Sequence, residues 1–128
     1  MPRTTVIFYR EPSGETPVLD WLVVLRRTNA RAYERCVAAV QRLAELGHEL
    51  RRPLADLLRD GIYELRIRTG RVNYRILYFY YRRGLAVLGH ALTKEDVVPD
   101  AEIERCSRRK RAFESDPETH GYSDEEES

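Results

Sequence analysis

The sequence predicts a small α+β domain with the element order β-α-α-β-β-β-α, in which a curved antiparallel sheet packs against helices on one of its faces. Two segments in the first half carry apolar residues at helical spacing, and three consecutive runs in the second half have the composition of strands. The links between those runs are short and contain glycine. We expect one domain over residues 1–114, followed by an acidic, disordered tail over residues 115–128.

The first predicted elements are a strand and a short helix. Residues 4–10, TTVIFYR, favour a strand because β-branched and aromatic side chains predominate. Thr16 suits an N-cap and Pro17 suits the first helical position, so a helix is expected over residues 17–26.

A second, longer helix is expected to follow almost at once. Thr28 or Asn29 caps it, one apolar stripe runs along it, and Gly47 is suited to terminate it. Residues 48–61 are then expected to form a connector with one helical turn around residues 53–58.

The second half predicts two successive hairpins and a last helix. Strands are expected over residues 62–68, 72–81 and 84–92, and the middle one is apolar on both faces, as a strand covered on both sides would be. A helix over residues 99–113 begins at Pro99, with its acidic residues first and its basic residues last, the order that the helix dipole favours.

Net charge divides the chain into two unequal parts. Residues 114–128 hold seven acidic residues and no lysine or arginine, so residues 1–113 carry a net charge of +8. Twenty of the 22 basic residues are arginine. A GC-rich genome explains the preference for arginine over lysine, but it does not explain the excess of positive charge, which favours an anionic partner.

Several functional classes find no support in the sequence. Cys36 and Cys106 lie far apart, outside any metal-binding spacing, and are expected to be core residues on helices. No cofactor motif, paired carboxylates or metal cluster is visible. The chain also has no apolar run of membrane-spanning length and no signal-peptide pattern, so we expect a cytoplasmic protein.

The stretch YELRIRTGRVNYRILYFYY, residues 63–81, places four arginines within ten positions: Arg66, Arg68, Arg71 and Arg75. Two interpretations are open. The residues form either the solvated face of an arginine-rich sheet, or a surface that holds a phosphate backbone while tyrosines stack on unpaired bases.

The three histidines differ in their expected roles. His120 lies in the predicted tail and His48 follows a helix-ending glycine, where a surface role is expected. His90 near the end of the last strand is the best-placed titratable candidate for acid–base chemistry, although a lone histidine is more often structural.

The motifs G-I-Y-E-L-R, Y-R-I-L-Y, L-G-H-A-L-T-K and P-D-A-E-I-E-R-C follow one another between residues 61 and 106. Together with VLDWL and RLAELGHELRRPLADLLRDG before them, they resemble the phage-derived HigB-like branch of the RelE/ParE toxin superfamily. The resemblance covers most of the chain, from about residue 5 to residue 113. It implies the toxin of a type II toxin–antitoxin pair, either an mRNA endoribonuclease or an inhibitor of DNA gyrase.

The resemblance also implies roles for individual residues. By position it implies three catalytic residues, Arg66, Arg75 and Lys94, to which we add His90 as the candidate base. For RNA binding we expect Arg68 and Arg71 to hold the backbone and Tyr74 or Tyr78 to stack on a base or position it. The chain departs from the family pattern at Glu64, where some members carry a lysine, and at Pro99, near the place of a C-terminal tyrosine.

From these observations we expect a metal-independent endoribonuclease that cuts translated mRNA at the ribosome and needs no cofactor. The alternatives are a non-catalytic gyrase inhibitor and an inactive, toxin-like interaction protein. The expected partners are mRNA, the ribosome and a cognate antitoxin with a helix-turn-helix, through which alone the protein would meet DNA.

Overall fold

The computed structural model describes residues 3–93 and 97–123. Its helices and strands are β1 (Thr5–Tyr9), α1 (Pro17–Thr28), α2 (Ala30–Leu46), η1 (Gly47–Glu49), β2 (Ala55–Arg59), β3 (Ile62–Thr69), β4 (Val72–Tyr80), β5 (Leu85–Thr93), α3 (Asp100–Ser115), α4 (Pro117–His120) and β6 (Gly121–Tyr122). None of the described helices is long and apolar enough to cross a membrane.

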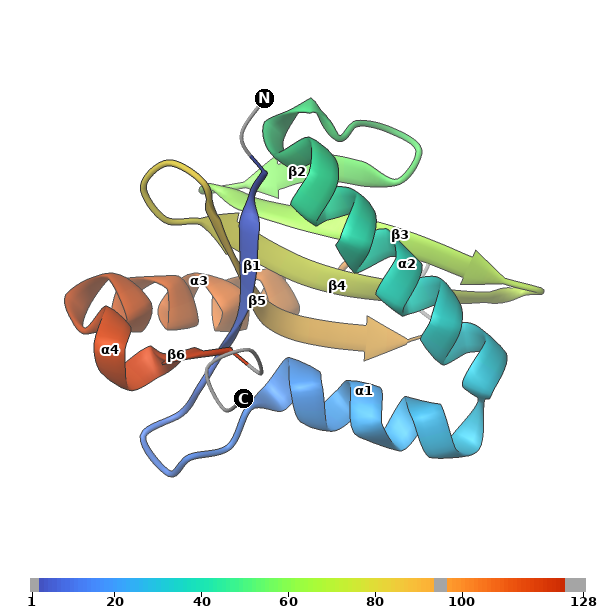
Figure 1. The fold of residues 1–128 in the computed structure, drawn as a ribbon, viewed down its shortest axis with the longest axis horizontal. Coiled ribbons are helices and arrows are strands. Elements are labelled where there is room, and N and C mark those ends of the chain that lie inside the picture. The colour runs from blue at the N-terminus through green and yellow to red at the C-terminus, as the bar shows by residue number, and fades with distance from the viewer. Residues whose placement is uncertain (1–2, 94–96, 124–128) are drawn as a thin grey trace.

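The strands form one curved sheet in the order β2-β3-β4-β5-β1-β6 (Figure 1). All neighbouring pairs are antiparallel except β1 and β5, which run parallel. A parallel pair needs a long crossover, and the chain between β1 and β5 supplies it with two helices and three strands. The predicted α+β class, the two N-terminal helices, the three strands and the last helix are confirmed.

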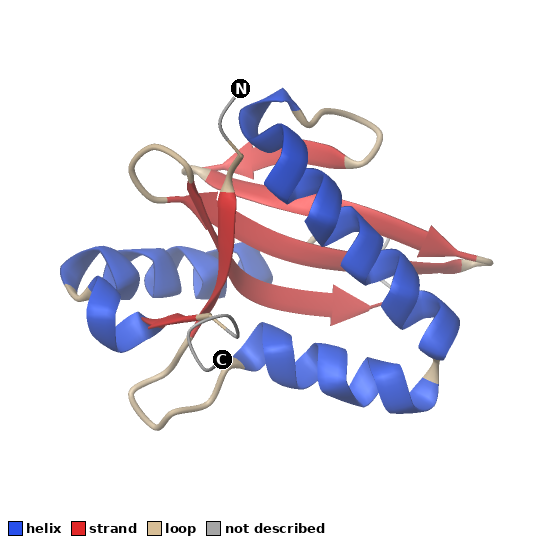
Figure 2. Ribbon diagram, viewed as in Figure 1, coloured by secondary structure: helices blue, strands red, loops and turns tan. Residues whose placement is uncertain are grey.

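Helices lie on both faces of the sheet (Figure 2). The first core lies between the sheet and the pair α1 and α2, and it includes Leu22, Leu43, Leu65, Ile76 and Leu88. The second core lies between the sheet and α3, and it includes Leu77, Phe79, Val87, Ile103, Cys106 and Phe113. Side chains alternate along a strand, so β4 contributes to both cores and is the buried central strand that the sequence predicts.

The expectation that helices cover only one face is therefore wrong for α3. Beneath α3, β5 contains a β-bulge in which Gly89 is the extra residue between Leu88 and His90. A Cβ atom at Gly89 would lie 2.8 Å from the Cys106 sulfur, so the glycine allows this close approach. Cys36 and Cys106 are free and buried on helices, as predicted.

The predicted helical turn around residues 53–58 is also wrong, because residues 55–59 form the strand β2, paired with β3. Asp60 and Gly61 join the two strands, both with positive φ. Aspartate followed by glycine is a strong hairpin signal, and the sheet pairing that it directs outweighs local helix propensity in LADLL.

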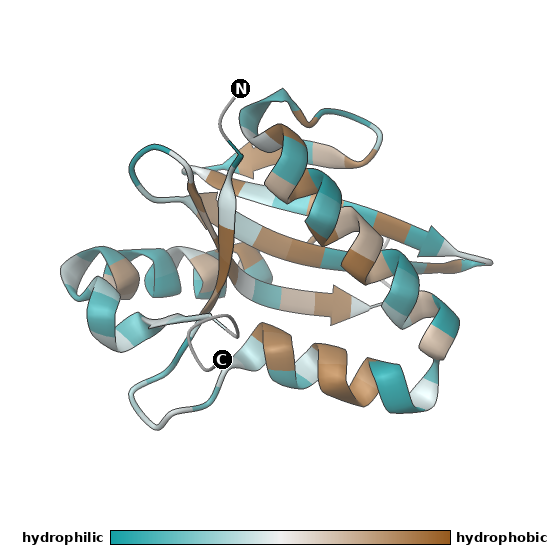
Figure 3. Ribbon diagram, in the orientation of Figure 1, coloured by the Kyte–Doolittle hydropathy of each residue, from teal (hydrophilic) through white to brown (hydrophobic). Residues whose placement is uncertain are grey.

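The predicted disorder from residue 115 is wrong for the described part of the tail. Helix α3 continues to Ser115, α4 follows, and β6 pairs with β1. Figure 3 shows why the sequence suggests otherwise, since α3 and α4 are predominantly hydrophilic. A few specific contacts hold the segment in place. The buried His120 ring stacks on the Tyr9 ring with centroids 5.2 Å apart, and its Nδ1–H donates to the carbonyl oxygen of Arg10 at 2.8 Å.

These contacts predict that the end of the chain contributes to stability. Truncation after Asp116 removes the His120 stack and four hydrogen bonds between Arg10 and residues 118–120, and should lower the free energy of unfolding by at least about 2 kcal/mol. Truncation after Ser123 is the control, because it keeps all of these contacts. Urea denaturation measures both, and equal stability of the two truncated chains would contradict the role given to residues 117–122.

Candidate nucleic-acid interface

The hairpin β3–β4 gathers polar side chains on one face of the sheet. Arg66 lies opposite Arg75, and Arg68 lies opposite Asn73. Since residues two apart in a strand share a face, all four belong to the face that α3 partly covers. Leu65 and Ile67 of the same strand face the first core, so the alternation that the sequence predicts for β3 is confirmed.

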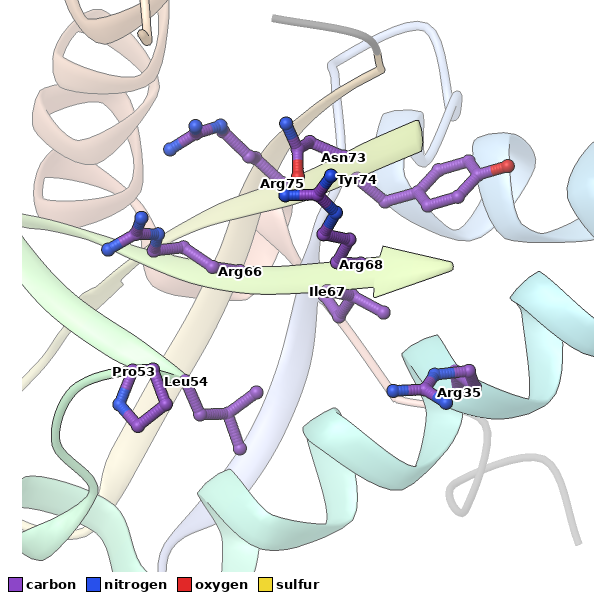
Figure 4. Close-up of a pocket in the computed structure, with 9 residues that line it drawn as sticks. All are labelled: Arg35, Pro53, Leu54, Arg66, Ile67, Arg68, Asn73, Tyr74 and Arg75. Carbon is purple, nitrogen blue, oxygen red and sulfur yellow. The ribbon is translucent and has the colours of Figure 1, made fainter. Parts of the chain in front are cut away.

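The hairpin borders a hollow of about 380 Å³, here called the edge hollow (Figure 4). Its lining residues come from α2, the loop before β2 and both strands of the hairpin: Arg35, Pro53, Leu54, Arg66, Ile67, Arg68, Asn73, Tyr74 and Arg75. The hollow lies where β3 loses its neighbour, because β2 pairs with β3 only as far as Leu65. A last hydrogen bond, from Arg66 N–H to the Leu54 carbonyl at 2.7 Å, closes that ladder.

Three exposed arginines surround the edge hollow. Arg66 and Arg68 come from β3 and Arg35 comes from α2. Within the described residues the side chains of Arg35 and Arg66 form no ion pair or hydrogen bond, while Arg68 Nε donates to the Gly70 carbonyl at 3.2 Å. Planar guanidinium groups bind phosphate oxygens in pairs, so their positions suit an anionic backbone.

Arg75 has a different environment from the other arginines. Only 6% of the residue is exposed, and its Nη1 donates to Glu64 Oε1 at 2.5 Å; Glu64 is 4% exposed. The pair is diagonal across β3 and β4, since Glu64 lies directly opposite Leu77. A buried charge is tolerated when it is paired, and Glu64 supplies that partner for a guanidinium that also lines the edge hollow.

The structure brings together four of the eight residues that the sequence and the resemblance select. Arg66, Arg68, Tyr74 and Arg75 all line the edge hollow. Arg71 is exposed at the hairpin turn and does not line it.

Tyr78 faces the first core, where it is 1% exposed and packs against Tyr63 and Tyr80. Burial raises the pKa of its hydroxyl above the ordinary range. Lys94 lies outside the described residues.

His90 lies beneath α3 and not in the edge hollow. Its Nδ1 lies 3.2 Å from Arg109 Nη1, and its Nε2 lies 3.2 Å from Glu102 Oε1. Because a guanidinium only donates, Nδ1 accepts, and the proton on Nε2 is donated to Glu102. Burial is the main cause that lowers the pKa of His90 from its usual 6.5, so the neutral ring links β5 to α3.

Three residues of this site were missed at the sequence level. Arg35 lies about thirty positions before the hairpin, and only the packing of α2 over β3 brings it near. Asn73 is visible as the cross-strand neighbour of Arg68 once the register is known. Glu64 can be identified from the sequence, because an acidic residue on the same strand face as the arginines is a candidate ion-pair partner.

The described residues hold no group of three or more His, Cys, Asp or Glu side chains placed to bind a metal ion. The lining of the edge hollow likewise contains no carboxylate or imidazole among the residues that the structure describes. What it offers is positive charge and the Asn73 amide, which suit binding and charge stabilisation.

The family model described as phage derived protein Gp49-like (DUF891) matches residues 23–111, which include α2, the hairpin β3–β4 and most of α3. No curated protein matches the chain.

The ion pair predicts that replacing Glu64 markedly lowers the free energy of unfolding. Glu64→Ala leaves the buried Arg75 guanidinium without this carboxylate, and should cost about 3–5 kcal/mol of unfolding free energy. The double variant Glu64→Leu with Arg75→Met should recover much of that loss, because it replaces both charges by apolar groups. Urea denaturation of the three chains tests this, and a stable Glu64→Ala single variant would contradict it.

The buried His90 predicts a pH dependence of stability. Its folded pKa is lower than its unfolded pKa, so the unfolded chain binds more protons below about pH 6.5 and stability falls as the pH drops through that range. His90→Gln preserves a donor for Glu102 and an acceptor for Arg109 but does not titrate. We expect a smaller loss of unfolding free energy between about pH 7 and pH 5 in this variant. Parallel pH profiles for both chains would contradict the assignment.

Proposed function

The chain belongs to the Gp49-like family of phage-derived proteins, and from this premise and its resemblance to RelE-like toxins we propose that it is the toxin of a type II toxin–antitoxin pair. We propose further that it is a metal-independent endoribonuclease that cuts translated mRNA at the ribosome. The observation that carries the proposal is the edge hollow, an open strand edge that Arg66 and Arg68 border from one face of β3 and Arg35 borders from α2, over the other face.

The arginines fit the demands of phosphodiester cleavage. In a metal-independent reaction the ribose 2′-oxygen attacks the adjacent phosphorus, and the bond from phosphorus to the 5′-oxygen breaks. Negative charge grows on the phosphate oxygens in the transition state, and one well-placed donor lowers that barrier by about 2.7–4 kcal/mol. Arg66 is the proposed principal donor, with Arg68 and Arg35 holding the backbone; Lys94 is the proposed contact to the phosphate or the leaving group.

Proton transfer needs a different source. The 2′-hydroxyl must lose a proton and the departing 5′-oxygen must gain one, and a guanidinium stays protonated under these conditions. His90 is engaged by Glu102 and Arg109 under α3. We therefore assign the missing proton transfer to groups of the ribosome or of the RNA itself, which is the reason to propose cleavage of translated mRNA.

The same surface suits the proposed antitoxin. A partner with acidic side chains placed over the edge hollow would neutralise its arginines and block RNA at once. We propose that this partner is a helix-turn-helix protein and that DNA binding belongs to it. Since the proposed substrate is translated mRNA, the proposed location is the cytoplasm.

Arg66→Ala is the test that separates function from folding, because Arg66 is exposed and unpaired among the described residues. Arg75→Ala is less suitable, because it leaves the Glu64 carboxylate buried. Expression of the wild-type chain without antitoxin should stop growth and produce new mRNA 5′ ends within reading frames. Arg66→Ala should reduce cleavage by about 10²–10³-fold.

Arg83→Ala is the matched control, since it removes the same charge at the exposed β4–β5 turn, at the other end of β4. It should remain fully toxic. Growth arrest with intact mRNA and inhibited DNA supercoiling would replace the nuclease by a gyrase inhibitor, and normal growth on expression would indicate an inactive relative.

A further inference from the structure

A second hollow lies on the other side of the loop that borders the edge hollow. Its volume is about 370 Å³, and we call it the platform hollow. Residues Arg51 and Arg52 line it from the loop, while Pro53 and Leu54 of the same loop line the edge hollow. The two hollows are thus separated by one short segment of chain between η1 and β2.

Stacked aromatic rings form one wall of the platform hollow. His48, on η1, stacks on Tyr80 with ring centroids 3.7 Å apart and an interplanar angle of 26°. Tyr63 meets the edge of the His48 ring at 6.4 Å, and it also packs on the fully buried Tyr78. His48 is exposed and lines the hollow, so part of its ring is accessible to a ligand while Tyr80 stacks on it.

The charges at the opposite wall are unequal. Arg52 Nε donates to Asp56 Oδ2 at 2.9 Å, so this arginine is already paired. The side chain of Arg51 is exposed and makes no hydrogen bond or ion pair within the described part of the chain. Leu57 adds an apolar surface that is 53% exposed. One free guanidinium, one open aromatic face and one apolar wall therefore meet in the same hollow.

We propose that the platform hollow is a nucleotide subsite, in which an unpaired base stacks on His48 and the adjoining phosphate binds Arg51. Aromatic faces bind bases of any sequence, and a guanidinium beside them binds the backbone. Leu57 covers part of the base. The subsite rests on the proposed function in one respect: the nucleotide belongs to the RNA strand whose neighbouring phosphate occupies the edge hollow.

The positions of the two hollows support a continuous path for a single strand. Arg35, Arg66 and Arg68 lie on one side of the loop and Arg51 lies on the other. An RNA strand that crosses this loop contacts exposed arginines on both sides of it, and the platform hollow lies on the side of Arg51. Among the residues that the structure describes, Asp56 is the one carboxylate in the lining of the two hollows, and it is paired with Arg52.

The test uses the full chain and a short, fluorescently labelled 2′-O-methyl RNA, which binds but has no 2′-hydroxyl to react. Fluorescence anisotropy at low salt gives its Kd for wild type, His48→Ala, His48→Phe and Arg51→Ala. We expect His48→Ala to raise the Kd about tenfold, and His48→Phe to keep it near wild type because the ring still stacks. Arg51→Ala should raise the Kd and reduce the slope of log Kd against log salt by about one.

Arg83→Ala, with the same charge loss at a distant turn, should bind like wild type and serves as the control. If His48→Ala and Arg51→Ala bind RNA normally while Arg66→Ala does not, the subsite is overturned and the proposed function stands. If these two variants instead lose only the antitoxin, the platform hollow belongs to the protein partner and the subsite is again overturned. A wild-type chain that binds no RNA overturns the subsite, whereas the proposed function is decided by the separate mapping of mRNA 5′ ends. Circular dichroism confirms that each variant is folded.

Discussion

The ion pair between Glu64 and Arg75 fixes the geometry on which the arginine surface depends. Arg75 stands in the central strand, where both faces of the sheet are covered, and its charge needs a compensating partner there. Glu64 provides it only when β3 and β4 keep their observed register. A slip by one residue would turn every side chain of β3 to the opposite face. The pair therefore specifies that Arg66 and Arg68 lie beside Arg75 and not in the first core.

Much of the fold follows from local sequence because the strong signals agree with one another. The alternation in β3, the apolar run of β4 and the capped helices each predict an element that the structure confirms. The failures arise where pairing with another element decides. Residues 55–59 form a strand because the adjacent β3 pairs with them across the Asp60-Gly61 turn. Residues 117–122 are ordered because His120 docks on Tyr9 and β6 pairs with β1, partners that are distant in the sequence.

The candidate site shows the same division. Composition and alternation select Arg66, Arg68 and Arg75, since they depend only on the strand period. They do not distinguish the buried arginine from the exposed ones, because that difference comes from α3 covering the second face. Arg35 reaches this surface only through the packing of α2 across the sheet, which strand alternation does not reveal. The sequence predicts an acid–base role for His90, whereas in the structure it contacts Glu102 and Arg109 beneath α3. Sequence thus located the surface but not the role of each side chain.

The arginines beside the open end of β3 have a second role. An unpaired strand edge invites pairing with another chain, and charged side chains along it discourage that association. β2 covers the first part of β3, and the rest of that edge is flanked by Arg66, Arg68 and Arg35. Positive charge at this edge repels a second copy of the same edge. The same charge attracts a polyanion, so one set of residues protects the sheet and supplies the binding surface.

Magnitudes indicate how far these arginines take the proposed reaction. Enzymes lower reaction barriers by about 8–23 kcal/mol, and each well-placed donor supplies about 2.7–4 kcal/mol. The three exposed arginines of the edge hollow together reach only the lower part of that range, and they transfer no proton. Holding the RNA in an in-line geometry contributes about 7–11 kcal/mol more when it is done well. A shallow, basic hollow at a sheet edge cannot impose that geometry alone, whereas an mRNA already held in the ribosome meets the requirement before the toxin binds. Among the described residues, the lining of the edge hollow holds no acid–base pair, and this feature ties the proposed activity to translation.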